Sequence, residues 1–469
     1  MAFRTFRNQL LSIWQSVVAE DFPSRENDAL SNAVVEATAD YCEIAERHLD
    51  EGEAGEEVSF EDIEPALREG PREQLRYLSG AHHYLGMAFS QGNFDAASAV
   101  QSKLRPFEEG VGNLRQWKNC SIEYARYVSR VQSGPQYRSP EFDSHLMLTF
   151  SVIDDVLSAA DARIAIVGDW GTGEPVADLV MKGILAQKPD LLIHLGDVYT
   201  SGTNGETYTR FYNMIRSKIA ANALPVFVLA GNHDYYSGGD GFYQLIDHLN
   251  VPTAKQAASY FCLRNDYWQI LAMDTGYKDA NPHAGFLKKL VSAGKKRPET
   301  NLRDDEFRWH KHQLEQADGR GTILLSHHQP FSAYDAIGRP TKGDSLNTNL
   351  KKRFSPYFSA VASRSQVRAW FWGHEHDLVP IARGHHGLDL GVCMGHGAIP
   401  VDSKKVPRPG SPPYNGRDPY TPFKALGTDA GGYFNHGFAV LQLSKTNGYI
   451  EHWEVDETGI ASVLFGQTF

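Results

Sequence analysis

The chain is poor in cysteine. Its 469 residues include four, Cys42, Cys120, Cys262 and Cys393, and no two of them form a C-x-x-C pair. This spacing argues against a disulfide framework and against a zinc site built on thiolates. We therefore expect reduced cysteines with a structural role.

The chain also lacks long apolar runs and an excess of positive charge. No stretch approaches the apolar length of a membrane-spanning helix. The basic N-terminus is followed by neither an apolar run nor a cleavage site of small residues, so it does not resemble a secretory signal. The formal net charge of -11 argues against a sequence-independent nucleic-acid binder. These features predict a cytoplasmic protein without a membrane span, for which nucleic acid is not the expected partner.

The length of the chain predicts two domains. Apolar residues recur at helical spacing in the first part, and further helical stretches are expected at 72–91, 94–106 and 113–132. Turn-forming residues at 133–141 suggest a linker. We expect an all-helical domain over 1–140, which could bind a protein partner, and a second domain over 141–469.

Short apolar runs alternate with helical patterns in the second part, which is typical of an α/β domain. Five runs are expected to be buried strands: Ile164–Val167, Leu191–Leu195, Val226–Ala230, Ile323–Leu325 and Ala369–Trp372. Near the end of the chain, Asn447 and Gly448 stand between two strand-like runs, which predicts an antiparallel hairpin. A mixed, two-sheet sandwich therefore fits better than a simple doubly wound sheet.

Each of the five predicted strands ends in polar residues that could bind a metal. These ends are Gly-Asp169-Trp-Gly171, Gly-Asp197-Val-Tyr199, Gly-Asn232-His233-Asp234, Ser-His327-His328 and Gly-His374-Glu-His376. Open α/β sheets build their sites at the carboxyl ends of strands. Oxygen and imidazole ligands without thiolate suit Mn, Fe and Zn. Phosphoester hydrolysis benefits from two metals about 4 Å apart.

The order of these motifs resembles that of the calcineurin-like metallophosphoesterases over residues 162–455, and the first motif is most similar to the purple acid phosphatase variant. The resemblance implies a sandwich with α/β/β/α layers and two divalent or trivalent metal ions (Mn, Fe or Zn). It also implies that a hydroxide shared by the two metals attacks the phosphorus atom. Asp169 and His376 would bind the first metal, Asn232, His327 and His374 the second, and Asp197 would bridge them. His233 would assist as general acid or by stabilising the transition state, with Asp234 orienting its imidazole.

The first motif departs from the common pattern, because Gly171 stands where most members have a histidine. Purple acid phosphatases fill this place with a tyrosine three residues after the bridging aspartate. Here that position is Thr200, and Tyr199 comes one place early. On a strand this shift would turn the side chain to the opposite face, although a loop would relax the constraint. We therefore expect a loosely held first metal with three protein ligands, and no iron–tyrosinate centre.

Three other residues are candidates for the same site. Tyr199 and Thr200 could supply an extra ligand or contact substrate. His396, after another apolar run, could face substrate. His328 follows a predicted ligand, and alternation along a strand should point it away from the site.

The preferred function is hydrolysis of a phosphoric ester, with monoester and diester substrates both open. The substrate would be a phosphorylated small molecule or a phosphodiester. One alternative is a helical interaction module attached to a phosphoesterase domain of low activity. Another is a metal-dependent nuclease on the same scaffold.

Overall fold

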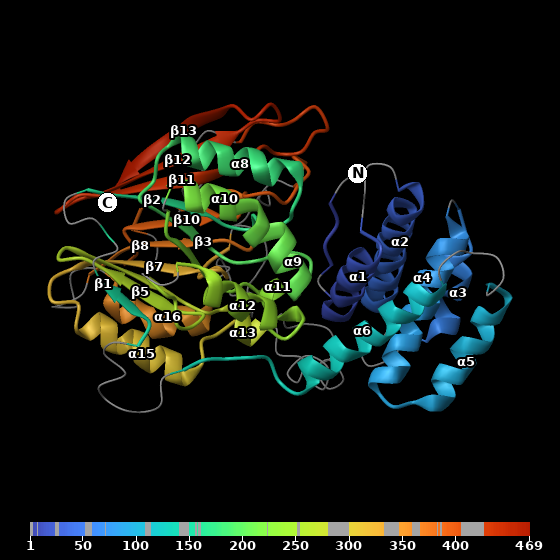
Figure 1. Ribbon diagram of the computed structural model, residues 1–469. Helices are drawn as coiled ribbons and strands as arrows, with labels where there is room; N and C mark the ends of the chain where they lie inside the picture. Colours follow the sequence, from blue (N-terminus) through green and yellow to red (C-terminus); the bar gives the residue numbers. More distant parts are fainter. Residues whose placement is uncertain are drawn as a thin grey trace.

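A computed structural model describes most of the chain (Figure 1). The described residues are 3–6, 8–23, 28–51, 59–70, 72–107, 114–139, 150–154, 157, 161–222, 224–250, 254–279, 300–332, 347–358, 366–381, 383–384, 387–404 and 426–469.

The first part of the chain is helical, as predicted. Its elements are α1 (Gln9–Asp21), α2 (Ala29–Glu51), α3 (Phe60–Leu67), α4 (Glu73–Ser90), α5 (Phe94–Leu104), the 3-10 helix η1 (Arg105–Phe107) and α6 (Leu114–Gln132). Gly92 breaks α4 from α5 with a φ of 64°, and the side chain of Asn93 caps α5 by accepting from the amide of Ala96. The helices enclose a hydrophobic cluster made of residues between Phe6 and Val131.

The second part is a two-sheet sandwich covered by helices on both sides (Figure 1). One sheet has seven strands in the order β1-β5-β6-β7-β8-β10-β9, and the other has six in the order β13-β12-β11-β2-β3-β4. The strands of the first sheet are β1 (Val152–Asp154), β5 (Phe261–Arg264), β6 (Trp268–Ala272), β7 (Gly321–Ser326), β8 (Gln366–Trp372), β10 (Leu390–Met394) and β9 (Leu378–Ile381). Those of the second are β13 (Ala461–Thr468), β12 (Gly448–Val455), β11 (His436–Leu443), β2 (Ala162–Val167), β3 (Leu191–His194) and β4 (Val226–Val228).

Alternation along the strands builds three layers of core. Ile164 and Ile166 of β2 face the other sheet, whereas Ala165 and Val167 face the outer helices. Helices α8 (Pro175–Ala186), α10 (Asn213–Asn222) and α12 (Asp240–His248) are on the side of the six-stranded sheet, and α15 (Asp304–Glu315) and α16 (Thr348–Phe354) are on the side of the seven-stranded sheet (Figure 1). The α/β/β/α prediction is confirmed, and so is the hairpin of β11 and β12.

The remaining elements are short, and all but η3 lie near the strand ends that carry the motifs. They are α9 (Asn204–Glu206), the π-helical turn η2 (Thr207–Tyr212), α11 (Asn232–Tyr236), α13 (Gly276–Asp279) and the 3-10 helix η3 (Ser355–Tyr357). Strands β2, β3 and β4 are parallel neighbours, and so are β7 and β8 of the other sheet. Their carboxyl ends therefore bring the five motifs to one edge of the sandwich.

No helix within the described ranges is long and apolar enough to cross a membrane.

Candidate metal centre

Four side-chain atoms converge between the ends of β3, β4, β7 and β8. The Nε2 atom of His327 lies 3.2 Å from Asn232 Oδ1, 3.2 Å from His374 Nδ1 and 3.3 Å from Asp197 Oδ2. Ligands bound at about 2.1 Å to one ion lie roughly 3.0–3.4 Å apart when their bonds make tetrahedral or octahedral angles. The spacing of these atoms therefore fits a common cation.

Backbone and side-chain contacts orient two of these ligands. The Nδ1 atom of His327 lies 3.0 Å from the carbonyl oxygen of Leu195. Because a carbonyl only accepts, Nδ1 carries the proton and the lone pair of Nε2 faces the other ligands. Asn232 donates from Nδ2 to the hydroxyl of Tyr236 at 2.9 Å, which directs its Oδ1 atom to His327.

A second set of atoms lies next to the first. Asp169, Asp197 and His376 offer ligand atoms within 4.8 Å of one another. The hydroxyl of Tyr199 donates to Asp169 Oδ1 at 2.7 Å and lies 2.9 Å from His376 Nε2. Three or four protein atoms therefore surround the position that the sequence predicts for the first metal.

The position of Tyr199 corrects the expectation drawn from strand alternation. β3 ends at His194, so Tyr199 lies in the loop that follows, and the two-residue period does not extend to it. Its ring packs against His233, with centroids 4.6 Å apart, and its hydroxyl reaches Asp169. The three candidate ligands Asp169, Asp197 and His376 therefore have the Tyr199 hydroxyl beside them, and the number of protein ligands on the first metal stays a prediction.

The carboxylate of Asp197 connects the two sets. Oδ1 accepts from the backbone amide of His233 at 2.9 Å, whereas the buried Oδ2 has no hydrogen-bond donor among the described residues. Such an oxygen needs a cation that faces it, and protonated His327, 3.3 Å away, supplies one. Asp197 is the residue best placed to contact ions in both sets.

The electrostatics of the buried groups favour a positive charge between them. Burial raises the pKa of Asp169 to about 7, and the nearby carboxylate of Asp197 adds to the rise. Burial opposes ionisation of Asp197, yet the imidazole of His327 holds the pKa of this carboxyl well below its usual range. The same pairing raises the pKa of His327 to about 9 against the effect of burial. A bound cation would take over the role of the proton in this cluster.

The contacts of His233 and Asp234 differ from those expected. The Nδ1 atom of His233 lies 2.6 Å from the carbonyl oxygen of Thr200. The carboxylate of Asp234 instead accepts from the backbone amides of Asp197, Val198 and Gly231, at 2.8, 3.1 and 2.8 Å. Asp234 thus holds two motif loops together, and the prediction that it contacts the imidazole is wrong.

His328 lies at the second group of ligands, contrary to the alternation argument. Its ring centroid is 4.3 Å from that of His374, and these two side chains and His327 form a candidate metal-holding group. β7 ends at Ser326, so alternation no longer applies at His328. Its Nε2 atom lies 3.3 Å from Asp279 and its Nδ1 atom 3.1 Å from the hydroxyl of Thr275. In the sequence, only its position next to the predicted ligand His327 pointed to a place at the site.

Thr200 and His396 do not join either group. The hydroxyl of Thr200 lies 2.7 Å from Ser16 Oγ, on the side of α1. The ring of His396 lies against Gly437 of β11, and both of its nitrogens lack hydrogen-bond partners in the described part of the chain. These contacts favour a structural role for both side chains, and a part in ligand or substrate binding stays a prediction for each.

Two positions near the candidate ligands have room only for glycine, because neighbouring atoms approach the backbone closely there. A Cβ atom at Gly171 would lie 2.8 Å from both the carbonyl oxygen of Asp197 and the Cα atom of Val198, so a histidine has no room there. A Cβ atom at Gly231 would lie 2.1 Å from Asp197 Oδ1. Both glycines allow the loop of Asp197 to pack against neighbouring backbone.

The candidate ligands also share an unusual backbone conformation. Asp169, Asp197, His374 and His376 have φ values of 55°, 74°, 69° and 56°. Such values are uncommon for residues other than glycine and are found where surrounding contacts enforce them, often at functional sites. Contacts with the surrounding structure therefore hold these loops in conformations that the residues would not prefer by themselves.

Of the comparisons with known proteins, the one with family models agrees with this arrangement. Residues 162–378 match the family model of the calcineurin-like phosphoesterases. No curated protein matches the chain. Among solved structures, a protein described as GAP50, the anchor in the inner membrane complex of Plasmodium, is 14% identical with a TM-score of 0.44, covering 66% of this chain and 89% of its own. PhoD is 12% identical with a TM-score of 0.43, covering 66% of this chain and 70% of its own. These two likenesses carry no inference about activity.

Proposed function

Because residues 162–378 form a calcineurin-like phosphoesterase domain, we propose that the chain hydrolyses phosphoric esters with two bound metal ions. The observation that carries the proposal is the position of Asp197. It belongs to one group with Asp169 and His376, and its Oδ2 atom lies 3.3 Å from His327 of the other group. A carboxylate shared by two cation sites is suited to phosphoester hydrolysis.

The proposal assigns each residue a role. Asp169, His376 and Tyr199 hold the first ion, and Asn232, His327 and His374 hold the second, with Asp197 contacting both. Ions bound there supply positive charge for the phosphoryl oxygens and lower the pKa of a water molecule. The oxygen and imidazole donors suit Mn, Fe or Zn, with Tyr199 favouring a metal that accepts a phenolate.

His233 is the proposed proton donor. Its Nδ1 atom lies against a carbonyl oxygen and therefore carries a hydrogen, so Nε2 is the ring atom that gives or takes a proton. The backbone amide of the same residue donates to Asp197. Both contacts fix the imidazole next to the ligands, and Asp234 fixes the loop of Asp197.

Two further expectations belong to the proposal. Residues 1–140 and 141–469 are proposed as separate domains, since the hydrophobic cluster of the helical part takes its residues from that part alone. The nuclease alternative gains no support from the acidic net charge of -11.

Hydrolysis of nitrophenyl phosphate and bis-nitrophenyl phosphate by metal-stripped protein refilled with Mn tests this function. We expect turnover of at least one ester, and a loss of at least about 10³-fold in Asp197→Asn, because the amide removes the shared negative charge. Monoester turnover alone would identify a phosphatase, and diester turnover a phosphodiesterase. No turnover of either ester by protein that contains two ions would contradict the assignment for small phosphoesters.

A further inference from the structure

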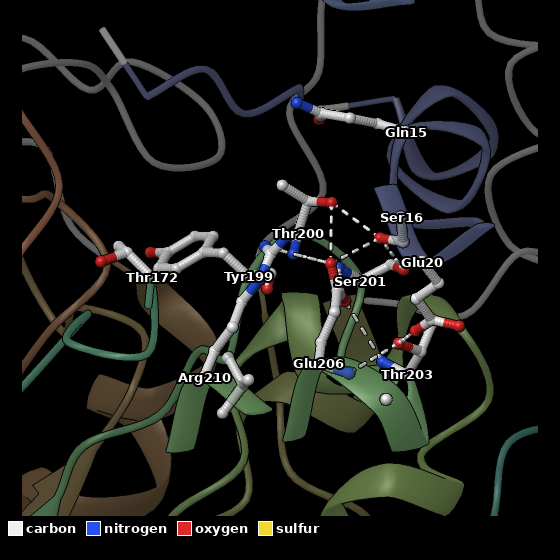
Figure 2. A network of polar contacts seen from close by, with 12 residues as sticks. Gln15, Ser16, Glu20, Thr172, Tyr199, Thr200, Ser201, Thr203, Glu206 and Arg210 are labelled. Atoms are coloured by element: carbon white, nitrogen blue, oxygen red, sulfur yellow. Dashed lines mark hydrogen bonds and ion pairs between the residues drawn. The ribbon is translucent and has the colours of Figure 1, made fainter. Parts of the chain in front are cut away.

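Helix α1 of the helical part packs directly on the loop that follows Asp197. The Oγ atom of Ser16 lies 2.7 Å from Thr200 Oγ1 and 2.8 Å from Glu206 Oε1. Ser201 donates from its hydroxyl to the same Ser16 atom at 2.7 Å. Figure 2 shows Ser16 pointing from its helix into this group of loop residues. All four side chains are buried.

Glu206 organises the loop from the inside. Its carboxylate accepts from the backbone amides of Thr200 and Ser201 at 2.7 and 3.0 Å, and it pairs with Arg210 at 3.1 Å (Figure 2). Arg210 also donates to the carbonyl oxygen of Tyr199 at 2.6 Å. The loop therefore has its backbone amides fixed by one carboxylate, and that carboxylate is in turn contacted by α1.

Thr200 links this network to the metal centre. Its hydroxyl contacts Ser16, its amide contacts Glu206, and its carbonyl oxygen holds Nδ1 of His233 at 2.6 Å. The preceding residue, Tyr199, places its hydroxyl on Asp169. A shift of Thr200 by a few tenths of an ångström would move both His233 and Tyr199.

Other residues of the N-terminal part also reach this region. Gln9 donates to the carbonyl oxygen of Tyr236 at 2.8 Å, and the hydroxyl of Tyr236 accepts from Asn232. The ring of Phe3 meets Tyr199 edge-on, with centroids 6.0 Å apart. The N-terminal part therefore contacts both the loop that holds His233 Nδ1 and the short helix α11 that contains His233.

We propose that Ser16 is a positioning residue of the metal centre, and that α1 sets the placement of His233 and Tyr199 through Thr200. The helical part is thus a component of the active-site scaffold rather than a separate binding module. This inference rests on the proposed function, in which His233 and Tyr199 act on the substrate and the first ion.

The test compares Ser16→Ala with Ser16→Thr and with Ser79→Ala in the full chain. Ser79 is an equally buried serine of the helical part that accepts from the indole of Trp14 and, among the described residues, has no hydrogen bond to the loop. With Mn and the better nitrophenyl ester, we expect kcat of Ser16→Ala to fall at least about tenfold with KM nearly unchanged, because misplacement of a catalytic group affects the chemical step. Ser16→Thr, which keeps the hydroxyl, should recover most of kcat, and Ser79→Ala should retain it.

A second readout does not depend on activity. In metal-free protein labelled with ¹⁵N-histidine, the Nδ1 proton of His233, assigned through His233→Asn, should shift and exchange faster in Ser16→Ala than in Ser79→Ala. If Ser16→Ala does not fold, Gln9→Ala at the half-exposed start of the helix should lower kcat in the same direction by a smaller factor.

The outcomes separate the two proposals. Loss of activity in Asp197→Asn together with unchanged kcat and an unchanged His233 signal in Ser16→Ala would overturn the positioning role alone. A wild-type protein without turnover would contradict the proposed function, and the His233 signal would then decide the role of Ser16. An equal loss of kcat in Ser79→Ala would show that the effect is general destabilisation and would also overturn the inference.

Discussion

Two candidate ligands, His327 of one group and Tyr199 of the other, are held in place by different parts of the fold. His327 directly follows β7 and His374 follows β8 after one glycine, so hydrogen-bonded neighbouring strands fix their positions. Tyr199 lies in a loop whose backbone depends on Glu206, Arg210 and the helix α1. Ligands at strand ends follow from sheet topology alone, whereas a loop ligand requires contacts that topology does not provide.

The largest expected difference between the groups is in activity. His327→Ala should lower kcat/KM by at least about 10³-fold, because it removes an atom that faces three other ligands. Tyr199→Phe keeps the ring packing and removes one hydroxyl, so we expect a loss of about 10–100-fold. Steady-state kinetics with Mn, and the metal content of each variant, check both values. Equal losses in the two variants would contradict the distinction between the groups.

Metal affinity should depend steeply on pH. Burial raises the pKa of Asp169 to about 7, and the pairing with Asp197 raises that of His327 to about 9. Metal binding must displace a proton from His327 below pH 9, and a proton from each of His327 and Asp169 below pH 7. The Mn affinity of the second site, which contains His327, should therefore fall about tenfold per pH unit below 9, and that of the first site, which contains Asp169, about tenfold per unit below 7.

Calorimetry at pH 6, 7 and 8 in buffers of different ionisation enthalpy would count the released protons. The raised pKa of Asp169 also makes the stability of the folded protein depend on pH. Since the folded metal-free protein favours protonated Asp169, that contribution is complete below pH 4 and is lost as the pH rises through about 7. Proton release that is constant across this range would refute the pKa argument.

A smaller effect is expected for Asp234→Asn. The amide would turn one NH₂ group toward backbone amides that now donate to the carboxylate. We expect activity to fall about 10–100-fold, the scale of residues that orient metal ligands. Asp240→Asn, at an exposed ion pair with Arg130, is the matched control for loss of a carboxylate and should keep full activity.

The smallest expected effect concerns the backbone at Gly171, which lies next to the first group of ligands. Gly171→Ala would place a Cβ atom 2.8 Å from the carbonyl oxygen of Asp197, so the loop must move. We expect the free energy of unfolding to fall by about 1–3 kcal/mol and the first ion to be held less tightly. Thermal denaturation with and without Mn measures both effects, and an unchanged midpoint in both conditions would show that the loop adapts freely.

Much of the fold and of the candidate site could be predicted from the sequence. Apolar runs identified the strands that carry the motifs, and the motif order pointed to Asp169, Asp197, Asn232, His327, His374 and His376, whose side chains the structure brings to one edge. These predictions depend on local hydrophobicity and on strand ends, which a sequence displays directly.

The predictions for Tyr199, His328, Thr200, His396 and Asp234 were less successful. The predictions for Tyr199 and His328 assumed that side chains alternate between the two faces of a strand, but both residues lie beyond the ends of β3 and β7. The contacts of Asp234 with the amides of Asp197 and Val198, and of Thr200 with Ser16, join residues far apart in the sequence. Such contacts depend on how loops and helices pack, and no local pattern records them.

Counting the ions bound to each variant tests the central claim most directly. Elemental analysis of Mn-refilled protein after gel filtration should give two ions per chain for the wild type. It should give between one and two for Tyr199→Phe, which loses one contact of the first site, and fewer than one for Asp197→Asn, in which both sites share the lost charge. A wild-type chain that folds but holds no more than one ion, or an Asp197→Asn variant that still holds two, would contradict a centre of two metals joined by Asp197.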